Sequence, residues 1–311
     1  MKNFGTIALL MFPFLAFAGL TEDQEAAKEA FLRSEKAAYT YLDQVQATLI
    51  IDHPELLNPV PEAAKESERP ESNPSSPPLQ TDDTGTPGPG GIELNTTMSC
   101  DRSSVSKSCE RLIDVNFGVG EKLQIKVERA YQVQHGPDGD SSRGMGPTDI
   151  GLKYRFYDRK GFSAAIYPTV TVDNSSRRDS QGEKMESGGN AIYIPLILSK
   201  DIGNYTVVTN TGYRRSFKDR DDDSIIGGIS VGKAINETTR VMGEVFSERD
   251  RNFHNRRTDV RVGFIKIVTP NSAKFQTSVY ASLGRSVGRT EDGVPHTTLQ
   301  FGLSIVKKPG S

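Results

Sequence analysis

The sequence predicts an all-β fold: a 12-stranded antiparallel transmembrane β-barrel, preceded by an N-terminal helix and a disordered linker. Two observations predict the barrel. Between about residues 92 and 306, stretches of roughly ten residues alternate apolar with polar at every second position, as half-buried strands do. The connections alternate between tight turns and long hydrophilic loops, which is typical of outer-membrane barrels. An even number of strands also places both ends of the barrel on the turn side.

Residues 1–18 have the pattern of a secretory signal peptide. Lys2 supplies a positive charge, residues 4–15 form an apolar core, and Ala16-Phe17-Ala18 is a small-residue cleavage site. The apolar core is too short to anchor the chain in a bilayer. We therefore expect export across the inner membrane of a Gram-negative bacterium.

Residues 19–53 are predicted to form a periplasmic helix. Thr21 and Gln24 have the spacing of a capping box, residues 21–53 lack Gly and Pro, and apolar residues recur at helical spacing. The apolar stripe of residues 21–53 could self-associate, pack on the barrel, bind a periplasmic partner or remain solvated.

Residues 54–91 differ in composition from both neighbours. They contain nine of the 17 prolines, many Ser, Thr, Asp and Glu, and almost no apolar residues. Such a segment cannot bury an apolar core, so we expect a disordered, mostly extended linker. The barrel then occupies 92–306, and 307–311 form a C-terminal tail.

Twelve candidate strands can be assigned an apolar face by parity. The tight connections are predicted at 118–121, 158–161, 201–204, 236–238 and 269–272, and the long ones at 100–109, 134–147, 173–189, 215–223, 248–257 and 285–296. A soluble sandwich would show the same alternation within each strand. Aromatic residues on the apolar faces gather beside the tight turns, as in an interfacial girdle, and favour the membrane barrel. These are Phe117, Phe156, Phe162, Tyr205 and Phe275.

Charge and cysteine content narrow the functional classes. The net charge of -2 gives no indication of nucleic-acid binding. Cys100 and Cys109 are close together in an exported chain and predict a disulfide; a metal pair is the alternative, although no His lies nearby. We expect no metal and no cofactor. The expected partners are outer-membrane lipid and lipopolysaccharide.

Charged residues on the inward faces form a predicted lumen charge cluster. Its members are Lys126, Glu128, Lys153, Arg155, Arg240, Glu244, Asp259 and Arg261. They are expected as cross-strand neighbours of mixed sign. Two interpretations remain open: a constriction that filters solutes, or an ion-pair network that plugs a narrow lumen.

Aromatic residues are also predicted to face inward. Tyr167, Tyr193 and Tyr280 would form a lumen wall, which suits an apolar or aromatic solute or simply fills a tapered interior. The four histidines and the absence of a Gly-x-Ser-x-Gly motif give no catalytic constellation, so we do not expect an enzyme. The predicted function is a channel for small solutes; the alternative is a non-conducting barrel that serves as a structural or surface-interaction protein.

Several strands carry a family resemblance. Gly146-Pro147-Thr148-Asp149-Ile150-Gly151-Leu152-Lys153-Tyr154-Arg155-Phe156, then Tyr167-Pro168, and then Ile194-Pro195-Leu196 with Asn210-Thr211-Gly212-Tyr213, are similar to the outer-membrane proteins labelled "meta-pathway of phenol degradation". The resemblance covers roughly residues 91–306. It implies a barrel that passes small, often aromatic or apolar, molecules, and it implies no catalytic residues.

Overall fold

The computed structural model describes residues 78–136, 139–251, 256–269, 275–288, 290 and 293–307. The predicted signal peptide, the periplasmic helix, linker residues 54–77 and tail residues 308–311 lie outside these ranges. Within them, no helix is long and apolar enough to cross a bilayer.

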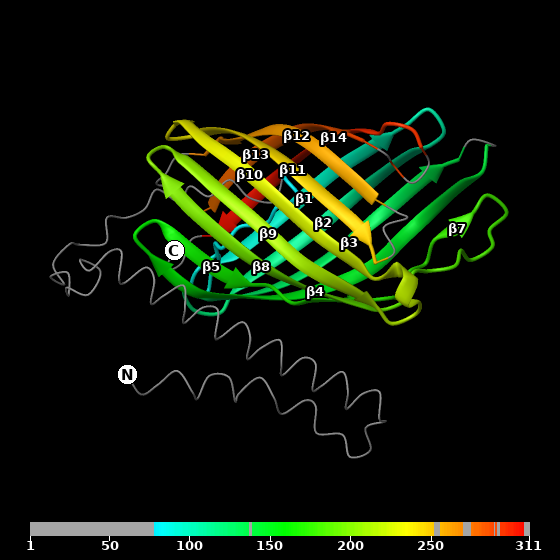
Figure 1. Cartoon of the computed structure of the whole chain (residues 1–311), viewed down its shortest axis with the longest axis horizontal. Helices are drawn as coiled ribbons and strands as arrows, with labels where there is room; N and C mark the ends of the chain where they lie inside the picture. Colours follow the sequence, from blue (N-terminus) through cyan, green and yellow to red (C-terminus); the bar gives the residue numbers. More distant parts are fainter. Residues whose placement is uncertain are drawn as a thin grey trace, which may run out of the picture. The chain divides into compact units, whose positions relative to one another are not determined.

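Twelve wall strands close into one antiparallel barrel, as predicted (Figure 1). The labels run to β14, because β5 and β6 share one wall position and β7 lies in a loop. The strands are β1 (Ile92–Arg102), β2 (Lys107–Gly118), β3 (Leu123–His135), β4 (Ser141–Arg159), β5 (Phe162–Ile166), β6 (Thr169–Val172), β7 (Arg178–Asp179), β8 (Ala191–Ile202), β9 (Tyr205–Ser216), β10 (Ser224–Asn236), β11 (Thr239–Asp250), β12 (Arg256–Ile267), β13 (Phe275–Ser286) and β14 (Thr297–Lys307). Strand β1 pairs with β14 along its whole length, from Ile92 opposite Lys307 to Arg102 opposite Thr297. The closed ring leaves no free sheet edge, as a membrane-spanning sheet requires.

One predicted strand is interrupted. Strands β5 and β6 are two parts of the same wall position, and Tyr167-Pro168 separates them because proline has no N–H to donate to the ladder. The Pro168 carbonyl still accepts from the Leu152 N–H of β4 at 2.9 Å, and the Tyr167 N–H donates to the Pro195 carbonyl of β8 at 3.1 Å. The wall therefore remains joined across the break. The short β7 lies in a loop, pairs with the outer end of β4, and forms a single bridge between Arg178 and Lys184.

Two of the predicted long loops were wrong. Strands β1 and β2 continue to Arg102 and from Lys107, so only residues 103–106 connect them, and Cys100 lies directly opposite Cys109. Strands β3 and β4 likewise continue to His135 and from Ser141. The backbone ladder extends beyond the apolar stretch because N–H and C=O groups pair equally well where both faces are polar. The other loops of this end include residues 173–190 and the 3-10 helix η3 (Arg220–Asp222).

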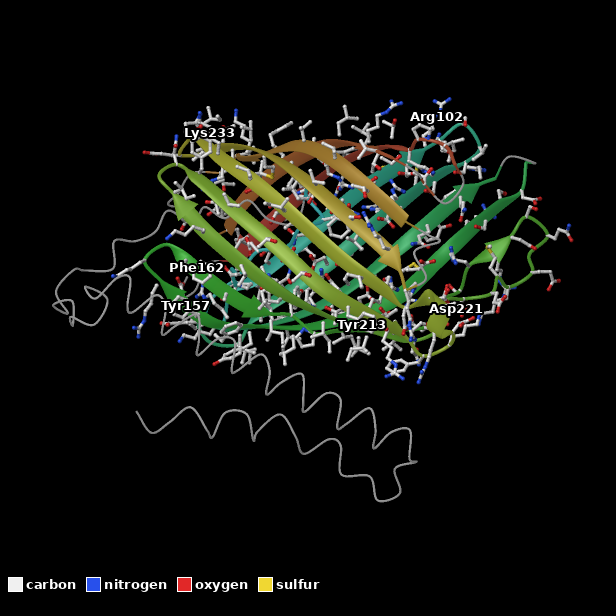
Figure 2. All side chains as sticks on the ribbon, viewed as in Figure 1. Arg102, Tyr157, Phe162, Tyr213, Asp221 and Lys233 are labelled. Atoms are coloured by element: carbon white, nitrogen blue, oxygen red, sulfur yellow. A yellow bond between two sulfur atoms is a disulfide. The ribbon has the colours of Figure 1, made fainter. Side chains whose placement is uncertain are left out.

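The barrel has an apolar exterior. Large apolar side chains on the faces assigned by parity are exposed, for example Leu94 at 39%, Ile225 at 50% and Val262 at 59%. All five predicted girdle aromatics are exposed as well. Phe162 and Tyr157 lie at the turn end of the barrel, with Lys233, whereas Arg102 and Asp221 lie at the loop end (Figure 2).

The interior is mostly polar. Buried polar and charged residues outnumber buried apolar ones among the described residues, and a single small cluster of buried apolar side chains combines Ala165, Tyr167, Ile197 and Val208. The outer surface of the wall, by contrast, exposes apolar side chains over its whole height. Exposed apolar patches of this extent mark contact with a membrane or with protein rather than with water. The distribution of polarity is that of a membrane barrel.

Candidate functional site: the barrel lumen

Residues 78–91, which precede β1, lie inside the lumen. This differs from the expectation of a disordered linker over 54–91. Leu79 is 2% exposed, and Thr81 and Thr84 are fully buried. The segment runs from the middle of β12 and β13, where the Ser282 hydroxyl donates to the Pro78 carbonyl at 3.1 Å, to the turn end of the barrel. It then enters the wall as β1.

Glu244 of β11 provides the strongest attachment of this segment. Its carboxylate accepts the Gln80 N–H at 3.0 Å, the Thr81 N–H at 2.9 Å and the Thr81 hydroxyl at 2.8 Å. The Arg261 guanidinium approaches the same carboxylate at 3.4 Å, and the Glu244 side chain is 0% exposed. A carboxylate buried this completely needs charged and hydrogen-bonding partners, and the segment supplies three of its donors.

Asn210 and Lys153 hold the next residues. The Asn210 side-chain amide accepts the Asp82 N–H at 2.6 Å and donates to the Asp82 carbonyl at 2.8 Å. The Lys153 ammonium lies 2.8 Å from the Asp82 carboxylate and 3.7 Å from that of Asp83. Lys153 is therefore neutralised by the segment rather than by the barrel wall.

The wall leaves space for the segment where it passes. At Gly228, an added Cβ would lie 2.8 Å from the Thr81 hydroxyl, and at Gly118 it would lie 1.8 Å from the Gly88 carbonyl. Near the exit, the Thr84 hydroxyl lies 2.6 Å from that of Ser163, and the Gly90 N–H donates to the Gly118 carbonyl at 3.0 Å. Close backbone approach requires glycine at Gly118.

The predicted charge cluster is divided into separate contacts. Glu244 and Arg261 lie opposite each other on β11 and β12, as predicted. Lys126 forms an ion pair with Glu128 of its own strand at 2.6 Å. Asp259 is paired with Arg257 at 2.9 Å, a residue that the sequence analysis did not select.

Two members of the predicted cluster lie toward the turn end. Arg155 donates to the Glu121 carbonyl at 2.8 Å and lies 3.5 Å from Asp158, so it does not join Lys126 and Glu128 as expected. Arg240 lies opposite Ile265 in the ladder, four positions along the register from the Glu244–Arg261 pair. The eight residues therefore do not form one ring of charge.

The predicted aromatic residues are inward but not equivalent. Tyr167 is 4% exposed and lies beneath the Lys153 ammonium, 4.8 Å from its ring centroid. Tyr280 is 2% exposed, and its hydroxyl lies 2.6 Å from that of Thr97 on β1. Tyr193 is partly buried on β8. None of the three lines the cavity described next.

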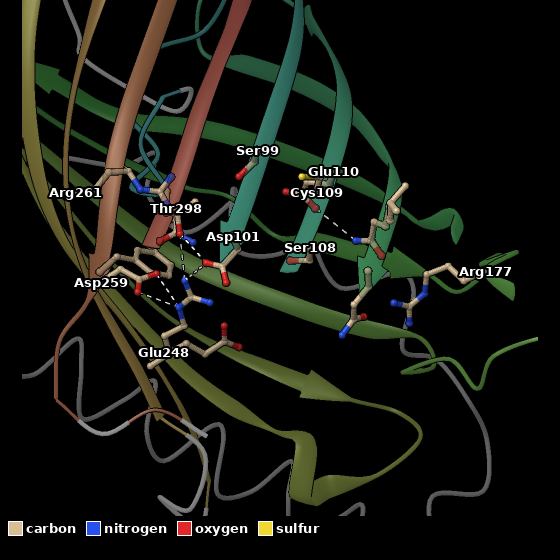
Figure 3. Close-up of a pocket in the computed structure, with 16 residues that line it drawn as sticks. Ser99, Asp101, Ser108, Cys109, Glu110, Arg177, Glu248, Asp259, Arg261 and Thr298 are labelled. Atoms are coloured by element: carbon tan, nitrogen blue, oxygen red, sulfur yellow. Dashed lines mark hydrogen bonds and ion pairs between the residues drawn. The ribbon is translucent and has the colours of Figure 1, made fainter. Parts of the chain in front are cut away.

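A cavity of about 430 Å³ occupies the loop-end half of the lumen (Figure 3). Gln80 of the lumen segment belongs to its lining. The Arg257 guanidinium lies 2.6 Å from the Asp101 carboxylate and 2.9 Å from that of Asp259, and Arg177 stands on the far side of the cavity from Asp259. Hydroxyl, amide and charged side chains therefore dominate the walls. The remaining lining residues are Ser99, Ser108, Cys109, Glu110, Gln132, Val133, Gln134, Phe246, Glu248, Arg261 and Thr298.

The predicted disulfide is present between Cys100 and Cys109. It joins directly opposite residues of β1 and β2 beside the cavity. The sequence analysis missed Asn210, which binds the lumen segment, and the two acidic residues of that segment, Asp82 and Asp83. Only one signal could have indicated them: Asn210 is polar at an inward position between the apolar Val208 and the small Gly212.

Comparisons with known proteins show the fold. No protein-family model matches the sequence, and no curated protein matches it. An outer membrane channel from Pseudomonas putida F1 aligns with a TM-score of 0.57 at 12% identity, over 74% of this chain and 99% of that chain. The NanC porin aligns with a TM-score of 0.49 at 12% identity, over 68% and 98%. At 12% identity, the likeness to the Pseudomonas putida F1 channel shows the β-barrel fold alone.

Proposed function

We propose that this chain is a channel of the Gram-negative outer membrane for small polar solutes, and that residues 78–91 close it in this structure. One observation carries the proposal: a continuous polar interior, enclosed by an apolar wall, leads from the loop end through a cavity of about 430 Å³ to the Gln80 end of the lumen segment. Along this route, buried polar side chains of the wall strands offer hydrogen bonds in addition to those of the lumen segment. A hydrated solute keeps its hydrogen-bonding partners on such a path.

The character of the cavity favours polar solutes over the apolar or aromatic ones that the sequence suggested. Its apolar lining is confined to Val133, Phe246 and the disulfide-bonded Cys109. Moving an apolar solute through the remaining lining would displace water from charged groups without replacing its hydrogen bonds, which is costly. The same polar surroundings suit transport rather than catalysis, and no enzymatic activity is proposed.

The placement of the chain follows from its surfaces. The exposed apolar band would contact outer-membrane lipid, and the long loops would contact lipopolysaccharide. The turn end, where the lumen segment enters β1, would face the periplasm together with the N-terminal residues, as in barrels with short periplasmic turns.

One observation favours a second function, a non-conducting structural barrel. The segment is bound by Glu244, Asn210 and Lys153, and its Leu79, Thr81 and Thr84 side chains are buried. If the segment never leaves, the loops of the outer end would be the working surface.

Conductance in planar bilayers tests the two functions. The informative variant is the full-length chain with Gln80→Pro, Thr81→Pro, Asp82→Ala and Asp83→Ala, here called the release variant. It removes both N–H donors and the hydroxyl from Glu244 and both carboxylates from Lys153. A channel predicts discrete openings that are larger or longer in the release variant than in the natural chain. A release variant that is folded, with an altered migration of the unboiled sample on a gel, yet carries no current would support the structural function.

A further inference from the structure

We propose that the lumen wall carries a binding site for a short, extended, acidic peptide, which residues 80–84 occupy in this structure. The inference deepens the proposed function, because it names a ligand class for the channel lumen. The contacts that hold the segment recognise features of any peptide of this kind. They do not depend on its attachment to β1.

Main-chain recognition is the first component. The Glu244 carboxylate accepts two successive N–H groups, those of Gln80 and Thr81. The Asn210 amide then pairs with both the N–H and the carbonyl of Asp82, as a neighbouring strand would. Three consecutive residues are thus read through backbone groups that every peptide possesses, as in recognition by strand addition.

Acidic side chains are the second component. The Lys153 ammonium is 4% exposed and lies 2.8 Å from the Asp82 carboxylate and 3.7 Å from that of Asp83. The same ammonium lies over the Tyr167 ring, 4.8 Å from its centroid. An ammonium buried in this way strongly prefers a ligand that brings a carboxylate, since charge-assisted hydrogen bonds are roughly twice as strong as neutral ones.

The wall groups require an occupant once the segment leaves. With the segment in place the Glu244 side chain is 0% exposed. When the segment leaves, Glu244 retains the Arg261 guanidinium at 3.4 Å but loses the Gln80 and Thr81 donors, and Lys153 loses both of its carboxylate partners. Burying charges without full pairing is unfavourable, so an emptied site would bind a ligand that offers N–H donors to Glu244 and a carboxylate to Lys153. An apolar solute lacks both of these features, and a neutral sugar lacks the carboxylate.

Binding of a labelled peptide tests the site without measuring current. The probe is the end-blocked peptide Gln-Thr-Asp-Asp-Thr, and its fluorescence anisotropy is followed with the detergent-solubilised release variant. We expect saturable binding that weakens at least about 10-fold when both aspartates of the peptide are replaced by asparagine, which corresponds to about 1.4 kcal/mol. Adding Lys153→Met to the release variant should give the same loss. Adding Arg155→Met should not, because Arg155 lies on the same strand but contacts Glu121 and Asp158 near the turn end instead.

A second measurement uses the otherwise natural chain and does not need the release variant to fold. Leu79 is 2% exposed, and both natural cysteines are disulfide-bonded, so Leu79→Cys introduces a single shielded thiol. We expect the acidic peptide, but not its asparagine counterpart, to accelerate labelling of this thiol by a maleimide as it displaces the segment. Absence of saturable binding, or equal effects of the two peptides, would overturn the site. Binding by a barrel that carries no current would overturn the channel and leave the site standing.

Discussion

The outward face of β12 allows a direct test of whether the wall lies in lipid. Val262 is at the middle of the strand, 59% exposed, and its ladder neighbours are Gly243 and Leu283. Val268 is 53% exposed and lies just past the end of the strand. Six residues separate them, which is about 20 Å along a strand at ~3.4 Å per residue. At a tilt of ~45° this becomes about 14 Å of depth, more than half of an apolar band ~25 Å tall.

Arginine should therefore be tolerated very differently at the two positions. Val262→Arg should lower the free energy of unfolding by about 2–4 kcal/mol, and Val268→Arg by at most about 1 kcal/mol, the costs expected at the midplane and near the interface. Unfolding by urea in phosphatidylcholine vesicles can be followed by tyrosine fluorescence, since the chain has 10 tyrosines and no tryptophan. Equal losses at both positions, or no loss at Val262, would show that this face does not contact hydrocarbon.

Three further predictions concern the lumen and the loop end. Glu244→Gln replaces a carboxylate that accepts three donors by an amide, which removes about 3 kcal/mol of charge-assisted hydrogen bonding. The fraction of time that the channel is open in bilayer recordings should therefore rise roughly 100-fold. Glu248→Gln, on the same strand, should not change this fraction, and equal behaviour of the two variants would contradict the prediction. Cys100→Ser opens a disulfide with a sequence separation of 9, so amides of 103–106 should exchange faster at a cost of ~2–3 kcal/mol, and unchanged exchange would count against it. The Ser187 hydroxyl donates to the Asp173 carboxylate and holds the pKa of Asp173 below its usual range. This contact stabilises the loop above the unfolded pKa of about 3.9 and is lost as the pH falls through the lower folded value. An acid protease should therefore cleave 173–190 more slowly in the natural chain than in Asp173→Asn above that range, and the two rates, compared at the same pH, should become equal below it; a ratio that does not change with pH would contradict this.

The wall could be predicted from the sequence because side-chain alternation has only two outcomes. Once Ile225 or Val260 is assigned to the lipid side, every second residue of its strand must follow, and the structure confirms these faces. The same parity placed Glu244 and Arg261 opposite each other on the lumen side. Loop lengths were harder to predict. Ladders such as β1–β2 extend past the apolar stretch, where side-chain polarity no longer marks the end of a strand.

The lumen segment could not be predicted, for a physical reason. Proline-rich, polar residues were expected to stay disordered because they cannot bury an apolar core. In a barrel whose interior is polar, burial depends on hydrogen bonds instead, and Thr81 and Asp82 supply them to Glu244, Asn210 and Lys153. Composition rules derived from proteins with apolar cores therefore fail for a segment of this kind. The contacts of Arg155 were missed because parity gives the face of a residue but not its depth.

The position of the lumen segment directly before β1 has a consequence for biogenesis. Only residues 85–91 separate Thr84, whose buried hydroxyl contacts that of Ser163, from the strand that pairs with β14. Strand β1 cannot pair with β14 until β14 has been synthesised. By then the lumen segment, which is attached to β1, is already present to bind the wall. The barrel can therefore wrap around its own occupant, and the buried ends of Glu244 and Lys153 need never be desolvated in an empty cylinder.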